Sequence, residues 1–570
     1  MNTDSSKSRN KKERAGAGNQ RADKNAVVEP TPAPAPEISM RVWYLAGAVI
    51  LALAAFVRLY DLNLKPLHHD EGVNGFFLTN LMRTGVYHYD PANYHGPTLY
   101  YFALASSYIC GFLTSLWHGN LSLAQVRESG LSTFAIRLVP VFFGVATVWL
   151  LLCLRRHIGA VGSLVAAILV TISPGAIFLS RYFIHETQFV FFTLGMVVAA
   201  LRYYDTKNPL YPILGTISAA LLFATKETAM ISVGVLLIAL GCVAAYLSFN
   251  QEPQLATWEK RRRPPTKAAK PGTLQLVFGD AFKDESLLSI GLLALICALL
   301  FVLVNIVFYS SFFTYAKGVT DALEALTFWV KTGRNEHVHP WYTYLQWLMQ
   351  EESMLLILGT VGAVLAVSET KKRFPLYAAL WAFGILAAYS LVSYKTPWLL
   401  LNFIVPLAII GGYGVNEIFK LKPDIGLRLG LIAAALLVVS FTGYQAVKLN
   451  LFHYDDDTYP YVYAHTQRGF NQMMAEVEHY VARAGSGKQT QIVVTSPDYW
   501  PMPWYTRNYD HVGYWGHIVP PADAPIVIGN VSQESDLAQP LGHKYQRMGE
   551  YDLRPGVRLV LYVRRDLVEQ

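Results

Sequence analysis

The segment VWYLAGAVILALAAFVRLYDLNLKPLHHDEG, residues 42–72, joins a long apolar block to an adjacent pair of carboxylates. Residues 42–60 have the length and the apolar character of a helix that crosses a bilayer. Asp70 and Glu71 follow in the loop after this block. Because ionised carboxylates are costly in hydrocarbon, we expect the pair at the boundary between membrane and water, where it serves as a working acid or base.

Apolar blocks of similar length recur along the chain. Of its 570 residues, 53% are hydrophobic and only 15% are charged. We therefore predict an all-α polytopic membrane protein with about eleven transmembrane helices, surrounded by membrane lipids and without a nucleic-acid partner. The predicted spans are 42–60, 133–154, 158–179, 187–203, 209–224, 229–249, 286–309, 353–369, 374–392, 397–418 and 426–447.

One further apolar block, residues 98–117, is interpreted as an interfacial helix. If it crossed the membrane, most basic clusters would lie opposite the basic N-terminal tail, contrary to the positive-inside rule. Its Tyr, Ser and Gly residues suit a helix that lies on the membrane surface. Residues 42–60 then act as an uncleaved signal anchor in the plasma (inner) membrane, with the N-terminus cytoplasmic. A full crossing by 98–117 is the alternative.

Composition divides the chain into segments. Residues 1–40, rich in Lys, Arg, Ser, Pro and Ala, are predicted to be a disordered cytoplasmic tail. Residues 41–449 are predicted to form the transmembrane domain. Within it, 61–132 is the first external loop, with interfacial helices, and 250–285 is a cytoplasmic linker. Residues 450–570 are predicted to form a small extracytoplasmic α/β domain.

The pattern within this last domain predicts one helix and three strands. Residues 467–484 read as an amphipathic helix, and 491–496, 525–530 and 557–565 read as strands. Residues 496–515 are dense in Trp and Tyr. These aromatic side chains suit packing in a core, a place on the membrane surface, or contact with sugar rings.

With this topology, the ionisable residues at the helix ends gather on the extracytoplasmic face. They are Asp70, Glu71, Arg181, His185, Glu186, Lys226, Glu227, Lys331, Arg334, His337, His339 and Lys395. Each alone is explained as a solvated flank or a snorkelling side chain. A shared face that mixes carboxylates with cations also suits catalysis on a phosphate-bearing lipid, because cations neutralise phosphate while a carboxylate takes a proton.

Five motifs lie in order along residues 42–420. They are HHDEGVNGFF (68–77), YHGPTLYY (94–101), SRYFIHETQFVFF (180–192), LLFATKETA (221–229) and SYKTPWLLLNFIVPL (393–407). Together they resemble the integral-membrane glycosyltransferases of the C-type fold, especially the protein O-mannosyltransferase and aminoarabinose–lipid A transferase branches. More narrowly, the chain resembles a bacterial and archaeal family described as flippase-activity-associated.

The resemblance implies an inverting transfer of a sugar from a polyprenyl or dolichyl phosphate to a hydroxyl of a protein, lipid or glycan on the extracytoplasmic face. Asp70 would be the general base, and Glu71 would orient an acceptor or a neighbouring base. Glu186 stands where Asp is commoner in the superfamily. The residues that the resemblance assigns to substrate binding are His69, His95, Arg181, His185, Glu186, Lys226, Arg334 and Lys395.

Other functions remain open from the sequence. A transporter or lipid flippase would place ionisable residues or broken helices along a path near the bilayer midplane. A noncatalytic assembly partner of an enzyme would keep the fold and the lipid groove. No cofactor is predicted; a divalent metal at His68 and His69 is the alternative to a metal-free site.

Overall fold

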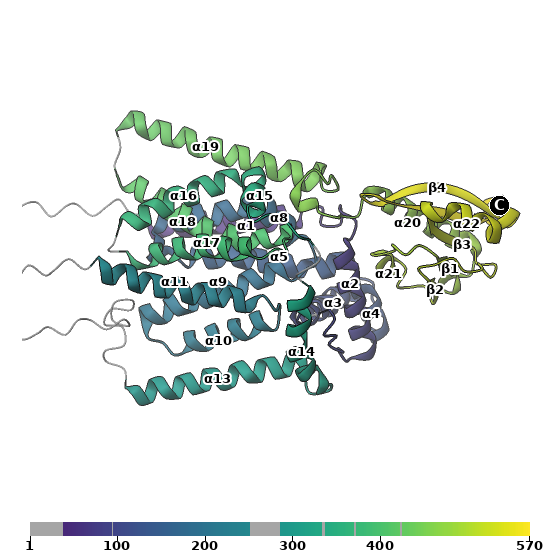
Figure 1. Cartoon of the computed structure of the whole chain (residues 1–570), viewed down its shortest axis with the longest axis horizontal. Helices are drawn as coiled ribbons and strands as arrows, with labels where there is room; N and C mark the ends of the chain where they lie inside the picture. Colours follow the sequence, from purple (N-terminus) through teal and green to yellow (C-terminus); the bar gives the residue numbers. More distant parts are fainter. Residues whose placement is uncertain are drawn as a thin grey trace, which may run out of the picture. The chain divides into compact units, whose positions relative to one another are not determined.

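The computed structural model of the chain describes residues 38–93, 95–250, 286–332, 337–369, 372–421 and 424–569. The predicted N-terminal tail, up to residue 37, and nearly all of the predicted linker at 250–285 lie outside the described residues. Residues from Ile38 onward form one compact unit, which contains a helical bundle and a smaller C-terminal domain (Figure 1).

The bundle confirms the predicted polytopic helical fold. Within the described residues, nine helices are long and apolar enough to cross a membrane, or up to eleven if two bent pairs each count as one span. The nine are α1 (Met40–Leu59), α3 (Thr98–Trp117), α5 (Thr133–Leu152), α9 (Glu186–Thr206), α11 (Ala229–Phe249), α13 (Leu287–Tyr309), α17 (Arg373–Leu391), α18 (Leu401–Lys420, entered through a 3-10 turn at Pro397–Leu400) and α19 (Ile425–Val447).

The remaining helices are bent or short. The bent pairs are α7 (Ala160–Ile172) with α8 (Pro174–Ser180), at 63°, and α15 (Thr343–Glu351) with α16 (Ser353–Ser368), at 111°. The short ones are α2 (His69–Thr84), α4 (Leu123–Gly130), α6 (Arg155–Ile158), α10 (Leu210–Phe223) and α14 (Lys317–Thr332).

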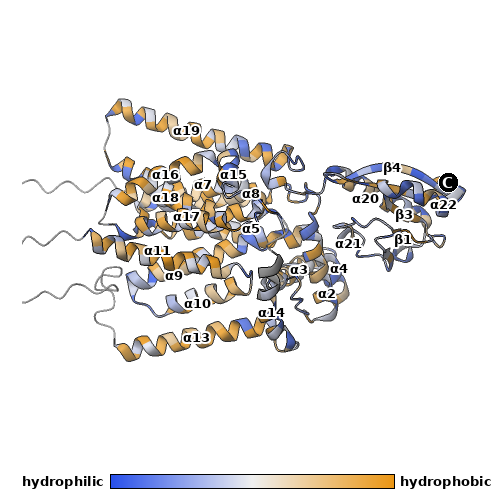
Figure 2. Ribbon diagram, viewed as in Figure 1, coloured by the Kyte–Doolittle hydropathy of each residue, from blue (hydrophilic) through white to orange (hydrophobic). Residues whose placement is uncertain are grey.

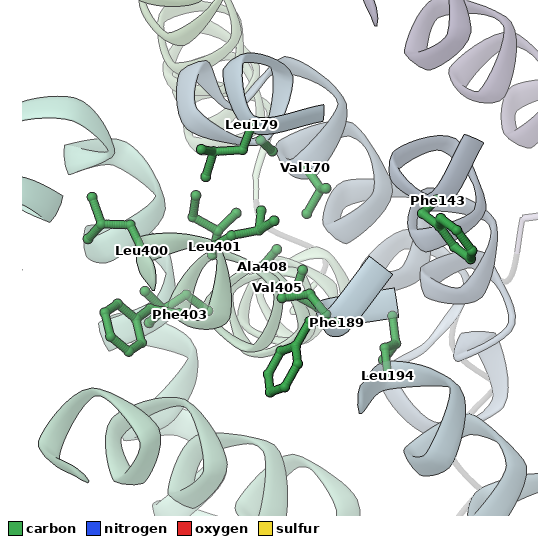
Figure 3. Close-up of a cluster of buried hydrophobic side chains, with 14 of the residues drawn as sticks. Phe143, Val170, Leu179, Phe189, Leu194, Leu400, Leu401, Phe403, Val405 and Ala408 are labelled. Atoms are coloured by element: carbon green, nitrogen blue, oxygen red, sulfur yellow. The ribbon is translucent and has the colours of Figure 1, made fainter. Parts of the chain in front are cut away.

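Helix α18 lies at the centre of the bundle, packed between α7, α16 and α17. Its side chains Leu401, Phe403, Val405 and Ala408 belong to the apolar cluster drawn in Figure 3. Glycines allow its backbone to approach its neighbours closely, as is typical of packed membrane helices. A Cβ atom at Gly412 would lie 2.3 Å from the carbonyl oxygen of Gly162 in α7, and one at Gly362 in α16 would lie 1.9 Å from that of Ile410.

Helices α13 and α19 form the periphery of the bundle. In the most apolar stretch of α13, none of the residues is buried. In that of α19, 6% of the residues are buried. Both helices are strongly hydrophobic, whereas the C-terminal domain is more hydrophilic (Figure 2). Exposed apolar surface of this extent requires a covering of lipid.

The end of α1 and the start of α5 lie close together. Arg137, near the start of α5, donates to the carbonyl oxygens of Leu62 at 2.9 Å and Lys65 at 3.0 Å, directly after α1. Helix α5 therefore begins at the end of the bundle where α1 ends. Helix α3 lies beside α2 and α4 (Figure 1) and is long and apolar enough to cross a membrane, so its interfacial placement stays a prediction.

The C-terminal domain contains one five-stranded sheet in the order β2-β1-β3-β5-β4. Helix α20 (Arg468–Ala484) packs on it and confirms the predicted amphipathic helix. The sheet is mixed: β1 pairs in parallel with β2 and β3, and β5 pairs antiparallel with β3 and β4. The strands are β1 (Gln491–Val494), β2 (His511–Tyr514), β3 (Ile526–Asn530), β4 (Tyr545–Arg554) and β5 (Val557–Arg564). The three predicted strands are β1, β3 and β5; β2 and β4 were not predicted.

The aromatic segment before β2 packs against α2. A Cβ atom at Gly72 would lie 2.6 Å from Cβ of Pro501, and one at Gly75 would lie 2.5 Å from the indole of Trp504. The Trp504 indole donates to the hydroxyl of Thr133 at 3.2 Å. Trp504 is buried, so its role here is packing that holds the C-terminal domain on α2.

Candidate active site

The candidate site is built on the first turn of α2. His68 is the N-cap: its Nδ1 accepts from the backbone amide of Asp70 at 3.0 Å, and Glu71 reaches back to the amide of His68 at 3.0 Å. Because Nδ1 accepts, the ring proton lies on Nε2, which donates to the carbonyl oxygen of Tyr463 at 3.3 Å. Burial lowers the pKa of His68, in keeping with a neutral ring.

Glu71 is fully engaged by other protein groups. Arg137 binds both of its carboxylate oxygens, at 2.8 and 2.7 Å, and the amide of Phe183 donates to it at 2.9 Å. The side chain is only 2% exposed. Burial raises the pKa of Glu71, but the guanidinium of Arg137 opposes this and the net pKa lies below its ordinary value. Glu71 therefore ties α2 to α5 and has no carboxylate oxygen left for a substrate.

Asp70, next to it in sequence, has a different environment. Its side chain is 40% exposed, and its carboxylate lies 3.4 Å from the hydroxyl of Tyr182 and 3.7 Å from Nδ1 of His68. Within the described part of the chain, no Lys or Arg forms an ion pair with it. Asp70 is thus the carboxylate of the pair that a substrate can reach.

Aromatic rings from distant parts of the chain surround this turn. The ring of His68 lies 5.0 Å from that of Tyr182 and 6.5 Å from that of Trp398, which precedes α18. The ring of His69 lies 6.1 Å from that of Trp500 in the C-terminal domain. The bundle and the C-terminal domain therefore both contribute to the rim around Asp70.

A second group of predicted residues forms paired contacts nearby. Lys226 binds Glu186 at 2.6 Å, and Nδ1 of His95 binds Glu227 at 3.0 Å. His185 contacts the backbone carbonyl that follows His95 at 3.2 Å, and the rings of the two histidines lie 4.9 Å apart. The structure thus brings together four residues of the predicted substrate-binding set, Lys226, Glu186, His95 and His185. Their charged and polar groups are largely bound by other protein groups.

The predicted phosphate-binding cations do not converge on one point. Arg181 donates to the carbonyl oxygen of Asp61 at 2.5 Å and lines a separate pocket beside α1. Lys226 is paired, as described. The ammonium of Lys395 donates only to carbonyl oxygens, those of His339 at 3.3 Å and of Val392, among the described residues. Arg334 lies outside the described residues.

Arg137 is the principal site residue that the sequence analysis missed. It is buried and hydrogen-bonds to both Glu71 and the loop after α1. The sequence does contain a signal for Arg137, because an arginine inside an otherwise apolar block is energetically costly unless it has partners. Tyr182 and Tyr463 were also missed, and nothing in their local sequence distinguishes them from ordinary interfacial tyrosines.

Within the described residues, no group of three His, Cys, Asp or Glu side chains is placed to hold a metal ion. His68 and His69 point to different partners. The ring of His68 contacts Tyr463, whereas that of His69 lies near Trp500. The two adjacent histidines therefore do not form one ligand set.

Comparison with known proteins agrees with this architecture. Residues 122–255 match the model of the dolichyl-phosphate-mannose-protein mannosyltransferase family. No curated protein matches the chain in sequence. Among solved structures, ArnT of Cupriavidus metallidurans bound to undecaprenyl phosphate is similar, with 13% identity, a TM-score of 0.54, and 92% of this chain and 98% of that one covered. Its apo structure gives 14% identity, a TM-score of 0.55, and coverages of 92% and 99%.

The archaeal oligosaccharyltransferase AglB of Archaeoglobus fulgidus, in complex with an inhibitory peptide and a dolichol-phosphate, is also similar. It shows 14% identity and a TM-score of 0.51, with 86% of this chain and 70% of that one covered. At these identities the likeness concerns the fold. The chain therefore has the glycosyltransferase C-type fold of these integral-membrane proteins.

Proposed function

We propose that the chain is a membrane glycosyltransferase that moves a sugar from a polyprenyl or dolichyl phosphate to an acceptor hydroxyl on the extracytoplasmic face. The observation that carries the proposal is the contrast between two adjacent carboxylates. Glu71 is buried and bound on both oxygens by Arg137, whereas Asp70 is 40% exposed at an aromatic rim. The match to the mannosyltransferase family and the fold of ArnT and AglB support it.

In the proposed reaction, Asp70 takes the proton of the acceptor hydroxyl as that oxygen attacks the anomeric carbon. The bond from this carbon to the donor phosphate oxygen breaks, and the phosphate leaves with the electron pair. Attack opposite to the leaving group inverts the anomeric centre. Glu71 and Arg137 act as positioning residues, because they hold the first turn of α2 and hence Asp70.

The leaving phosphate needs positive charge near it. Lys395 is the best-placed of the predicted cations, since its ammonium contacts carbonyl oxygens and no carboxylate among the described residues. Its segment continues to Trp398, whose ring packs near His68 at the start of α2. Lys226 shares its charge with Glu186 and is proposed to act mainly on the shape of the site. Arg334 stays a proposed contact.

A transporter is the second candidate, because two bent helix pairs and buried ionisable groups are present in the bundle. Two of these groups, Glu352 and Arg58, have structural partners. Glu352, at the bend between α15 and α16, accepts from the hydroxyl of Ser173 at 2.7 Å and the amide of Gly175 at 2.9 Å, at the N-terminus of α8. Arg58 donates to Ser180 and to carbonyl oxygens. Such contacts explain these charges as helix caps, so an interfacial enzyme is favoured.

Mass spectrometry of glycans and lipid-linked sugars in a strain that lacks the chain tests the proposal. We expect loss of one sugar modification and accumulation of its lipid-linked donor in the outer leaflet. The parent gene should reverse both changes, and an Asp70→Asn gene should reverse neither. Accumulation of the donor in the cytoplasmic leaflet would identify a transporter instead.

A further inference from the structure

A pocket of about 320 Å³ lies between α1, α8 and α19. Its lining is almost wholly apolar and includes Leu53, Phe56 and Val57 of α1, Ile177 of α8, and Gly443 and Val447 of α19. Phe56 is 61% exposed and Val447 is 49% exposed. Because these two side chains belong to lipid-facing helices, the pocket is open sideways to the hydrocarbon of the membrane.

The lining of the pocket includes a cation with incomplete hydrogen bonding. Arg181 is buried, and its Nε has no hydrogen-bond partner, while Nη2 donates to the carbonyl oxygen of Asp61. None of the ion pairs within the described part of the chain includes Arg181. Burial lowers the pKa of Arg181 to about 10, so the side chain remains cationic at neutral pH. A buried guanidinium without a counter-ion is energetically costly, and a bound anion would remove that cost.

A second polar residue that lines the pocket, Asn450, has a buried acceptor atom without a hydrogen-bond donor. Asn450, which also lines the pocket, donates through Nδ2 to the carbonyl oxygens of Pro174 at 3.2 Å and Ala446 at 3.0 Å. These two bonds fix the orientation of the amide. Its Oδ1 is buried and has no partner. The pocket therefore offers both a cation and an acceptor above an apolar groove.

This pocket is separate from the Asp70 site. The consecutive residues Arg181 and Tyr182 have different partners: Arg181 contacts Asp61 and lines the pocket, whereas Tyr182 contacts Asp70. The rings that surround Asp70, among them Trp398, do not line the pocket. Arg181 follows the last residue of α8 and contacts Asp61, in the segment that continues from α1 to Asp70.

We infer that this pocket binds a membrane phospholipid whose headgroup carries an amine or hydroxyl beside its phosphate. The phosphate accepts from Arg181 in a charge-assisted bond, the headgroup amine or hydroxyl donates to Asn450, and one acyl chain lies in the groove between α1 and α19. A lipid in this place anchors α19, which is otherwise almost unburied, to the helix that precedes the Asp70 loop.

Two glycines of α19 provide a matched test. Neither Gly443 nor Gly430 has an atom within 4 Å of a Cβ built on it, so a side chain can start at both positions without a clash at Cβ. Only Gly443 lines the pocket, and Gly430 lies about 20 Å away along the helix. The full-length chain would be purified in detergent and titrated with phosphatidylethanolamine, while native mass spectrometry measures the bound fraction. We expect Gly443→Phe to lower phosphatidylethanolamine binding at least tenfold and Gly430→Phe to leave it unchanged.

A second variant tests the headgroup contact. Arg181→Gln keeps a donor for the carbonyl oxygen of Asp61 and removes the charge, so it should also lower binding at least tenfold. Equal binding by the parent, Gly443→Phe and Arg181→Gln would overturn the inference. So would displacement of the phospholipid from this pocket by undecaprenyl phosphate at equal concentration, because the pocket would then belong to the donor.

The outcome is independent of the proposed glycosyl transfer. Asp70→Asn should bind the phospholipid like the parent, and Gly443→Phe should bind undecaprenyl phosphate like the parent. If transfer is absent altogether while phospholipid binding follows Gly443 and Arg181, the proposed function fails and the lipid site stands. If transfer depends on Asp70 while Gly443→Phe and Arg181→Gln bind the phospholipid like the parent, the lipid site fails and the proposed function stands.

Discussion

Asp70 and Glu71 are neighbours in sequence, yet their side chains are assigned to different tasks. Since α2 begins at His69, the two carboxylates leave its first turn in different directions. Glu71 meets the guanidinium of Arg137, and Asp70 meets the rim of the site. An exposed carboxylate with few partners keeps its oxygens available for a proton, which is what a general base requires.

Asp70→Asn is therefore expected to reduce sugar transfer by at least a hundredfold, since general-base catalysis contributes roughly 10²–10⁴-fold. The amide is nearly isosteric and cannot take the proton. The measurement is the initial rate with purified protein and a polyprenyl-phosphate sugar. Asp90→Asn is the control: Asp90 is exposed in the same segment between α1 and α5, and its contact to the amide of Ala92 survives in Asn. A loss smaller than about tenfold at Asp70 would remove it from the role of base.

Glu71→Gln should act on stability instead. It leaves the buried guanidinium of Arg137 without its counter-ion, a change that typically costs about 3–5 kcal/mol. Thermal unfolding in detergent measures it. Glu128→Gln, which removes an exposed pairing with Lys488, is the control and should change the unfolding temperature little. An unfolding temperature for Glu71→Gln equal to that of the parent would contradict the anchoring role.

The same pair predicts a pH effect. The folded-state pKa of Glu71 lies below its ordinary value, because Arg137 outweighs the effect of burial. Its contribution to stability is therefore complete above about pH 4.3, the ordinary pKa of Glu, and is lost as pH falls through the lowered value. Unfolding temperatures measured across this acidic range should converge for the parent and Glu71→Gln, and a constant difference would argue against the pairing.

At the scale of elements, α2 is the support of the site because both the bundle and the C-terminal domain pack on it. Gly72 and Gly75 lie three residues apart on one face of the helix, against Pro501 and Trp504. Small residues at this spacing are what allow close contact between packed elements. The helix position therefore depends on the absence of side chains at two points.

Gly75→Ala should loosen this contact, because its Cβ would lie 2.5 Å from the Trp504 indole. Overpacking of this kind typically costs about 1–3 kcal/mol. We expect faster proteolysis of the C-terminal domain and a lower unfolding temperature. Gly234→Ala in α11 is the matched control, since nothing lies within 4 Å of its added Cβ. Parent-like proteolysis of Gly75→Ala would show that the domain is held elsewhere.

At the scale of the whole molecule, the two ends of the bundle differ in the residues and domains that lie there. One end holds Asp70 and the C-terminal domain, and the other holds Arg155, whose guanidinium stacks on Trp43 at the start of α1. The segment from α1 to α5 begins and ends at the same end of the bundle. Together with the basic clusters, this arrangement gives the proposed orientation, with the site outside.

Cysteine labelling tests this orientation. In a background without the four native cysteines, Ser535→Cys, exposed in the C-terminal domain, should react with an impermeant maleimide in intact cells. Lys267→Cys, in the predicted cytoplasmic linker, should react only after the cells are opened. Labelling of the Lys267 position in intact cells would reverse the proposed orientation and place the site on the cytoplasmic side.

The sequence predicts those features that depend on local composition. Apolar blocks of bilayer length identified most of the candidate spans, because the transfer of apolar residues into lipid is set by each segment alone. The exceptions are 209–224, which forms the 14-residue helix α10, and 98–117, which forms a helix long enough to span. The period of 467–484 identified α20 for a similar reason. The Asp70–Glu71 pair was found because two adjacent carboxylates after an apolar block are unusual. This can be seen without knowledge of the tertiary structure.

The roles within the site depend on which distant segments meet. Sequence offers no sign that Glu71 binds Arg137, 66 residues away, and leaves Asp70 free. Nor does it show that Arg181 faces the α1–α19 pocket while Tyr182 faces Asp70. The strength of a charged contact depends on the partner and on burial, and both are set by packing between elements. Hydropathy therefore determines where this chain meets the membrane, and tertiary packing determines which of its charges are left to act.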